Sequence, residues 1–141
     1  MSREILFRGK RTYNKKWIEG SLVVDYAGNT YIVWEYETVK GAMISSKTIN
    51  VYPETVGEYT GLTDKNGKKI FEGDIIICKK EICGNFIDSC VEIGFVEMKH
   101  GAFGLHRKQG YYRPFKDWLE DYEYEIIGNI HDNPELLEVS K

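Results

Sequence analysis

The sequence predicts a mainly β protein in which a small β-barrel follows an N-terminal β-meander. Three observations favour this fold class: aromatic and β-branched residues dominate, apolar residues alternate or run continuously instead of recurring at helical spacing, and turn signals separate short apolar runs. The chain has 141 residues, which suits a single domain with its own core. We expect that domain to contain the meander in residues 1–56 and a hairpin with the barrel in residues 57–141.

The N-terminal part is predicted to consist of strands joined by short turns. The candidate strands are Glu4 to Lys10, Trp17 to Tyr26, Tyr31 to Tyr36, Ala42 to Ser45 and Ile49 to Tyr52. The first three form a meander, because Gly28 and Asn29 are typical turn residues between the second strand and the third. Pro53 cannot donate a hydrogen bond to a β-ladder, so it should end the fifth strand.

The segment from Pro53 to Ile76 predicts a hairpin that leads into a buried strand. Asn66 and Gly67 both tolerate positive φ, as the two central residues of a type I′ turn must. After this tip, Ile70 and Phe71 are expected to point into the core.

A second turn is predicted directly before the buried strand. Gly73 can turn the chain without Cβ strain, and the carboxylate of Asp74 can accept a backbone hydrogen bond there. The run Ile75 to Cys78 follows, and its three consecutive isoleucines need cover on both faces of a sheet.

The C-terminal part predicts a second hairpin and a final strand. Val91 to Lys99 and Phe103 to Arg107 should pair around the turn residues His100, Gly101 and Ala102. Tyr124 to His131 is the last apolar strand, and these short strands together suggest the barrel.

Helix is scarce in the pattern. One short amphipathic helix is predicted over residues 114–122, where the apolar positions have three- and four-residue spacing: Phe115, Trp118, Leu119 and Tyr122, after Pro114 in the first turn. A helical turn is expected at the C-terminus, with Asn133 as its cap and Pro134 as its first residue.

Two dense sequence blocks and the start of the chain carry a family resemblance. They are Val56 to Leu62 followed by Asp64 to Gly67 and Ile70 to Ile75, then Ile127 to Leu137, and at the start Arg3 to Arg8 with Trp17 and Gly20. The chain resembles the YopX family, which is encoded by phages and prophages of low-GC Gram-positive bacteria. Residues 79–123 match only loosely. The resemblance implies a β-barrel related to the Src-homology-3 (SH3) type, and it implies no settled activity or assigned site residues.

Composition and motifs narrow the classes of function. The net charge of −3 argues against a protein whose whole surface binds polyanions. No apolar signal segment or membrane-length apolar run occurs, so we expect a cytoplasmic protein in a bacterial host. No phosphate loop, nucleophile elbow, zinc-protease or dinucleotide motif occurs either, although sites built from distant residues escape such a search. We therefore expect no catalytic residues and no cofactor, and keep an unrecognised enzyme as the third alternative.

The cysteines raise the separate question of a zinc site. Cys78, Cys83 and Cys90 lack paired CxxC spacing, but His100 and His106 follow closely enough for a Cys/His cluster to form in space. The simpler interpretation is that Cys78 and Cys90 are reduced, buried small side chains of strands. His131, before Asp132, is expected to hydrogen-bond to a turn.

The charge order gives the candidate binding surface. Between Met98 and Lys116 the chain carries cations and aromatic rings but no acid, and the residues proposed to form a nucleic-acid or partner surface are Lys99, Phe103, Arg107, Lys108, Tyr111, Tyr112 and Arg113. Such a stretch can bind a single strand through phosphates and stacked bases. The acids of residues 117–125 follow directly, and the alternative is that the two halves neutralise each other within the fold or between subunits.

The first half of the chain is crowded with aromatic residues. They are Trp17, Tyr26, Tyr31, Trp34, Tyr36, Tyr52 and Tyr59. Packing is expected to bury most of them, and any that stay exposed mark an interface. The function that these observations favour is a non-enzymatic phage accessory protein, which acts through a host or phage protein or as a homo-oligomer that pairs by a strand edge or an aromatic face. Single-stranded nucleic acid is the alternative partner.

Overall fold

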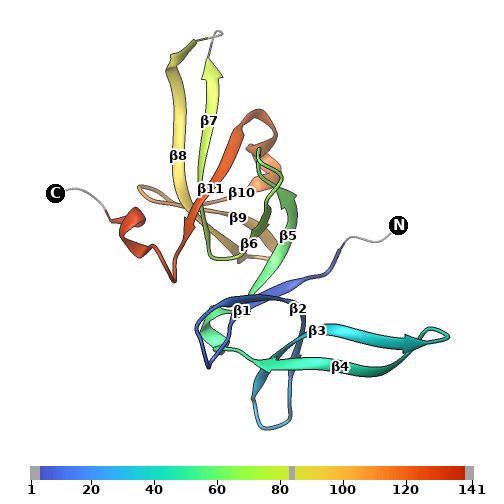
Figure 1. The fold of residues 1–141 in the computed structure, drawn as a ribbon. Helices are drawn as coiled ribbons and strands as arrows, with labels where there is room; N and C mark the ends of the chain where they lie inside the picture. Colours follow the sequence, from blue (N-terminus) through green and yellow to red (C-terminus); the bar gives the residue numbers. More distant parts are fainter. Residues whose placement is uncertain (1–3, 83–84, 139–141) are drawn as a thin grey trace. The chain divides into compact units, whose positions relative to one another are not determined.

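The computed structural model describes residues 4–82 and 85–138. The chain is mainly β, with two antiparallel sheets, and it divides into two compact units, Met1–Gly61 and Leu62–Lys141 (Figure 1). The strands are β1 (Phe7–Lys10), β2 (Trp17–Val24), β3 (Thr30–Val39), β4 (Ala42–Asn50), β5 (Gly57–Thr63), β6 (Lys69–Phe71), β7 (Asp74–Ile82), β8 (Asn85–Lys99), β9 (Ala102–Arg107), β10 (Tyr112–Pro114) and β11 (Glu123–Asn129).

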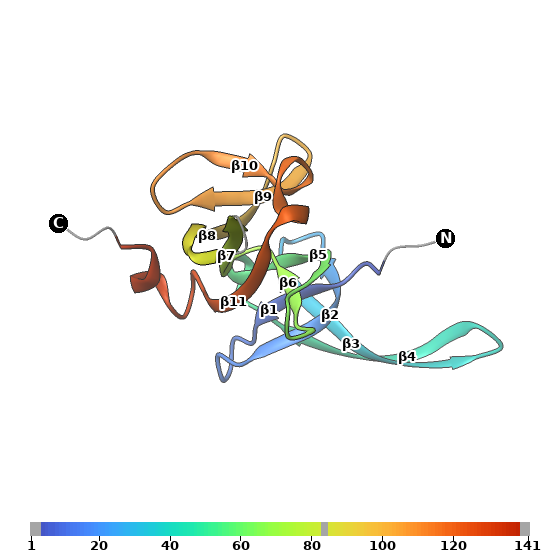
Figure 2. The same ribbon diagram turned by 90° about the horizontal axis from the view of Figure 1, so that it is seen from above.

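The first unit contains the predicted meander. The first sheet has the order β4-β3-β2-β1-β5-β6, so β1 to β4 pair in chain order. The two short strands expected in residues 42–52 are one strand, β4, which forms a long hairpin with β3 (Figure 2). Its pairing with β3 shifts register twice, and pairing continues after each of these local irregularities.

The core of the first unit is small. Ile18, Ile32 and Val51 are buried and form one cluster, against which Phe7 and Leu22 pack. The close approach at Gly9 shows how tightly this cluster packs, because a Cβ there would lie 2.9 Å from the Val51 Cβ.

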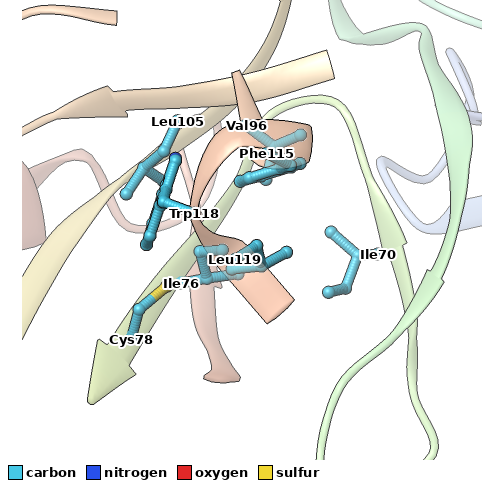
Figure 3. Close-up of a cluster of buried hydrophobic side chains, with 8 residues drawn as sticks. All are labelled: Ile70, Ile76, Cys78, Val96, Leu105, Phe115, Trp118 and Leu119. Atoms are coloured by element: carbon cyan, nitrogen blue, oxygen red, sulfur yellow. The ribbon is translucent and has the colours of Figure 1, made fainter. Parts of the chain in front are cut away.

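The second unit holds the larger core. Its sheet has the order β10-β9-β8-β7-β11. The buried cluster on one face of this sheet consists of Ile70, Ile76, Cys78, Val96, Leu105, Phe115, Trp118 and Leu119 (Figure 3). The predicted burial of the isoleucine run is confirmed at Ile75 and Ile76, which are fully buried.

The structure differs from the prediction of a small SH3-like β-barrel. The described residues form two open sheets and no closed barrel. Two of the edge strands, β6 and β10, have only three residues each, and β10 ends in Pro114, which has no N–H to extend a ladder. Strands this short cannot supply the continuous pairing that barrel closure requires.

The predicted helix over residues 114–122 is replaced by two 3-10 turns, η2 (Phe115–Asp117) and η3 (Leu119–Asp121). Trp118 separates them with a φ of −153°, outside the helical region. Its ring lies 6.1 Å from the Phe115 ring and 4.9 Å from the Tyr122 ring. The apolar spacing therefore identified the core side chains correctly, but their packing interrupts the helix. No helix in the described part of the chain is long and apolar enough to cross a bilayer.

The hairpin tip at Asn66 and Gly67 is a turn of another type than predicted. Gly67 has a φ of +81°, but Asn66 is not among the residues with positive φ. The Gly67 N–H donates to the Asp64 carbonyl at 2.9 Å, and the Asp64 N–H donates to the Lys68 carbonyl at 2.8 Å. Positive φ at both central residues, as in a type I′ turn, occurs instead at Lys40 with Gly41 and at His100 with Gly101.

The carboxylate of Asp64 explains this turn. Its Oδ1 accepts the N–H groups of Asn66 and Lys68 at 2.9 and 3.0 Å, and its Oδ2 accepts the N–H of Ile126 at 3.0 Å. Asp25 makes the same turn between β2 and β3, because its Oδ1 accepts the N–H groups of Ala27 and Asn29. Asp64 is buried, and it also fastens its turn to β11.

The remaining turn predictions are confirmed with one change. The buried Asp74 accepts the Phe71 N–H at 2.8 Å, and Gly73 turns the chain with a φ of +90°. The C-terminal turn is η4 (Pro134–Leu137), but the Asn133 side chain does not cap it. Its Oδ1 accepts the Asn129 N–H at 3.3 Å, which ends β11 at Asn129 instead of His131.

We predict that Asp64→Ala lowers the free energy of unfolding by about 3 kcal/mol, because buried N–H groups lose charged acceptors. Asp25→Ala is the matched control: it removes the same turn from an exposed site and should cost less. Urea denaturation of both variants measures the difference. Equal losses in the two variants would show that the contact with β11 contributes nothing.

The same carboxylate should make stability depend on pH. Burial opposes the ionisation of Asp64, but the N–H donors of Ile126, Lys68 and Asn66 outweigh it and hold its pKa below the ordinary value. A depressed folded-state pKa stabilises the protein above the unfolded pKa of about 3.9, and this contribution is lost as pH falls through the folded pKa. The stability gap between wild type and Asp64→Ala should therefore narrow on acidification.

We also predict that Cys78 is unreactive in the folded protein. Burial, and secondarily the charge of Glu92, raise the pKa of its thiol to about 12. In a chain with Cys83→Ser and Cys90→Ser, an aromatic disulfide reagent at about pH 8 should label Cys78 only as fast as the protein unfolds. Labelling in denaturant provides the control, and rapid labelling of the folded chain would contradict the prediction.

Candidate functional site

The basic and aromatic stretch lies on three neighbouring strands at one side of the second sheet. Lys99 ends β8, Phe103 and Arg107 belong to β9, and Tyr112 and Arg113 belong to β10. Lys108 and Tyr111 lie in the connection between β9 and β10, and the Tyr111 side chain is 85% exposed. The structure thus brings the seven predicted residues into one region, but it distributes them over two faces of the sheet.

Two of the seven residues serve the core face. Phe103 packs against the core cluster, and Arg113 lies opposite the buried Leu105 in the ladder of β9 and β10. The Arg113 guanidinium lies 5.2 Å from the centre of the Trp118 ring, whose Nε1 donates to the Arg113 carbonyl. Arg113 therefore packs on Trp118 in addition to carrying charge.

Arg107 takes part in a contact network near the end of β9. Its NH1 lies 3.5 Å from the Glu92 Oε1, and its Nε donates to the Tyr111 carbonyl at 3.1 Å. These contacts hold the connection between β9 and β10 and place a carboxylate beside the guanidinium.

The opposite face carries a row of rings. Phe95 and His106 stack with their centres 4.9 Å apart, and His106 pairs across the ladder with Tyr112. The Tyr112 hydroxyl donates to the carbonyls of Lys99 and Ala102. Burial, then the charges of Glu97 and Asp117, raise the pKa of Tyr112, so this hydroxyl stays protonated as a donor.

Gly104 makes room for the Tyr112 ring. A Cβ at Gly104 would lie 2.5 Å from the Tyr112 Cε2. The Lys99 ammonium lies 5.9 Å from the centre of the same ring, and Glu97 lies 3.2 Å from the His106 Nδ1. This face therefore combines aromatic rings with both signs of charge.

Two of the acids that follow the basic stretch form ion pairs with lysines outside it. Asp121 lies 4.0 Å from the Lys80 ammonium, and Glu125 lies 3.6 Å from the Lys65 ammonium. Arg107 pairs with Glu92. These ion pairs join the basic stretch of residues 99–113 and the acidic stretch of residues 117–125 to residues outside both stretches.

The geometry separates the residues proposed for a zinc cluster. Cys78 is fully buried in the core cluster, whereas His106 lies on the opposite face of the sheet in the row of rings. Cys83 lies outside the described residues, as does the side chain of Cys90. Within the described part of the chain, no group of three His, Cys, Asp or Glu side chains could hold a metal ion. The backbone N–H of His131 donates to the Asn129 Oδ1 at 3.0 Å, so the main chain of His131 takes part in this turn, and the hydrogen bond expected of its imidazole stays a prediction.

The first unit exposes several of its apolar side chains. Tyr26 is fully exposed, Trp34 is 45% exposed, and the neighbouring Val23 and Val24 are 43% and 58% exposed. Tyr59, by contrast, is buried. The Tyr36 side chain lies outside the described part. The aromatic crowding of the first half therefore reflects both core and surface positions.

A second basic and aromatic segment, which the sequence interpretation did not single out, lies in the β1–β2 hairpin. The Trp17 ring has the Arg8 guanidinium 4.5 Å and the Lys10 ammonium 5.5 Å from its centre. The signal that could have identified it is the absence of any acid between Glu4 and Glu19.

The sequence and the fold are similar to those of known proteins. The solved structure described as "Crystal structure of protein EF1440 from Enterococcus faecalis" is similar, with a TM-score of 0.59 and 28% sequence identity over 97% of this chain and 100% of that chain. A comparison with curated proteins gave no match. The family model described as YopX protein matches residues 6–138, nearly the whole length. The chain therefore belongs to the YopX family.

Proposed function

We propose that this YopX-family chain is a non-enzymatic accessory protein of a phage or prophage, which acts in the host cytoplasm through protein–protein contacts. Its first partner is a second copy of the same chain. The observation that carries the proposal is the exposure of Val23, Val24, Tyr26 and Trp34 on the β2–β3 hairpin of the first unit. Exposed aromatic and aliphatic side chains on adjacent strands are typical of interfaces.

The edge of the first sheet supports pairing between copies. β4 is an edge strand of nine residues, and its sequence contains one charged residue, Lys47. The Lys47 ammonium lies 5.2 Å from the centre of the Trp34 ring, so it packs beside the exposed aromatic surface. A long edge with little charge can accept another strand, and antiparallel pairing of two identical edges is self-complementary.

The displaced pKa values support a non-enzymatic role. The pKa of Asp64 is lowered by N–H donors of its own turn, and the pKa of Cys78 is raised by burial in the core. Asp25, whose pKa is lowered first by its hydrogen bonds with Asn29, also maintains a turn. Asp64 borders a cavity together with Tyr124, whose pKa is raised first by burial, but both oxygens of the Asp64 carboxylate already accept backbone N–H groups. In an active site such groups would be free to exchange protons with a substrate, whereas Asp25, Asp64 and Cys78 maintain the fold.

We predict that the wild-type chain self-associates and that Val24→Ser, Tyr26→Ser and Trp34→Ser together make it monomeric at the same concentration. Light scattering coupled to gel filtration measures the mass, for which the single chain has 16.4 kDa. Tyr111→Ser, an exposed aromatic residue in the second unit, is the matched control and should stay associated. A wild-type chain that is monomeric at every concentration would contradict the proposal.

Single-stranded nucleic acid is the second candidate partner, through Lys99 to Arg113. The observation that favours it is the row of Phe95, His106 and Tyr112 beside Lys99, since rings and cations on one face can stack bases and contact phosphates. The carboxylates of Glu92 and Glu97 beside Arg107 and His106 weaken the case, because they compete with phosphate.

For this candidate we predict that Lys99→Gln, Arg107→Gln and Lys108→Gln together weaken binding of a labelled oligothymidylate at low salt. Fluorescence polarisation measures the affinity. Lys40→Gln, Lys68→Gln and Lys116→Gln remove the same charge from other exposed positions and serve as the control. Equal affinity of both triple variants would eliminate this surface as the binding site.

A further inference from the structure

We propose that the β1–β2 hairpin of the first unit is a binding site for single-stranded nucleic acid. This site goes beyond the proposed protein contacts and lies in another unit than the stretch from Lys99 to Arg113. It consists of the ends of β1 and β2 and the loop of residues 11–16 between them.

The hairpin concentrates positive charge in a chain whose net charge is −3. The cations, which all lie within residues 8–16, are Arg8, Lys10, Arg11, Lys15 and Lys16. Lys15 and Lys16 are exposed. The neighbouring segments contribute four acids, one fewer than the cations. Three of them are exposed: Glu4 before β1, Glu19 opposite Arg8 in the ladder, and Glu54 in the 3-10 turn η1 (Pro53–Thr55); the fourth, Glu58 of β5, is half-buried and lies opposite Phe7. The local balance therefore stays positive, as contact with phosphates requires.

Hydrogen bonds hold the loop of this hairpin in one conformation. The Lys15 N–H donates to the Arg11 carbonyl, and the Arg11 N–H donates to the Lys16 carbonyl, both at 2.9 Å. The Lys16 N–H donates to the Asn14 Oδ1 at 2.9 Å. Lys15 has a φ of +59°, which the loop maintains through these bonds. A cationic loop that is already ordered loses less conformational entropy when it binds a ligand.

The loop is also fastened to neighbouring segments. The Thr12 N–H donates to the Asn50 carbonyl at 3.1 Å, and the Tyr52 hydroxyl donates to the Thr12 carbonyl at 3.1 Å. The Lys10 N–H donates to the Thr55 Oγ1 at 2.9 Å. The cations are thereby presented from a fixed backbone.

Aromatic rings lie among these cations. Arg8 and Lys10 are held over the Trp17 ring, which fixes the direction of two positive groups on one face of the hairpin. Tyr13, in the loop, is 72% exposed. An exposed ring between cations can stack a base while the cations contact the flanking phosphates.

This combination favours a nucleic acid over an acidic protein. Both ligands offer negative charge to Lys15 and Lys16, but an acidic segment has no base to place on Tyr13. A single strand presents unpaired bases together with a regular series of phosphates, so it engages both parts of the site.

The experiment is a polarisation titration of the full-length chain with a labelled oligothymidylate at several salt concentrations. We compare wild type with a hairpin variant that carries Lys10→Gln, Lys15→Gln and Lys16→Gln. Removing three phosphate contacts should weaken binding and lower the slope of log affinity against log salt by about 2. Tyr13→Ala should weaken binding at least about fivefold without changing that slope.

Two matched variants locate the effect. Two other triple variants remove the same charge as the hairpin variant: one changes Lys40, Lys68 and Lys116, and the other changes Lys99, Arg107 and Lys108. If the hairpin is the site, both should retain the wild-type affinity and the wild-type slope of log affinity against log salt. Circular dichroism and thermal unfolding verify that each variant is folded.

Three outcomes would overturn the proposal. The first is no binding of wild type at low salt. The second is an equal loss in all the triple variants, which would reflect total charge alone. The third is displacement of the oligonucleotide by polyglutamate at equal charge concentration, because the site would then recognise only negative charge. None of these outcomes depends on whether the chain self-associates, so this inference and the proposed protein contacts are tested separately.

Discussion

The hydrogen bonds that the buried Asp64 carboxylate accepts are the constraint that joins a turn of the second unit to its last strand. One oxygen orders the turn before β6, and the other accepts the Ile126 N–H in β11. Ile126 lies opposite the fully buried Ile76 of β7, so the turn is linked through β11 to the strand at the centre of the core. A buried charge is stable only when its hydrogen bonds are satisfied, and here the backbone supplies them. The first unit uses the same turn at Asp25 without the link to a distant strand.

The two units differ in how they use their apolar residues. The second buries large side chains such as Phe115, Trp118 and Leu119 over one face of its sheet. The first has a core of smaller aliphatic side chains and leaves Tyr26 and Trp34 exposed. Its β1–β2 hairpin adds an ordered set of cations around Trp17. The surfaces proposed for binding a partner therefore lie mainly on the first unit. The family resemblance, by contrast, is dense in the segment 56–75, whose residues chiefly form turns and strands.

Local patterns predicted most strands, and the errors have physical causes. The spacing of Phe115, Trp118, Leu119 and Tyr122 correctly marked apolar side chains that pack in the core, but Trp118 leaves the helical region to pack between its neighbours. The prediction of a type I′ turn at Asn66 and Gly67 was wrong. It rested on the conformational preferences of those two residues, whereas the turn is held by the Asp64 carboxylate, which accepts N–H groups from its own turn and from β11. The candidate surface was predicted as a run of residues, and strand alternation divided it between two faces of the sheet.

By itself the sequence determined the β class, the meander, the isoleucine core strand and the family, since these depend on period, turn residues and motifs that are local along the chain. Only the tertiary structure decided whether the sheets close, which aromatic residues stay exposed, and which cations share a face. Those properties depend on contacts between distant segments, such as Ile126 with Asp64, and the free energy of such a contact is not encoded at either residue alone.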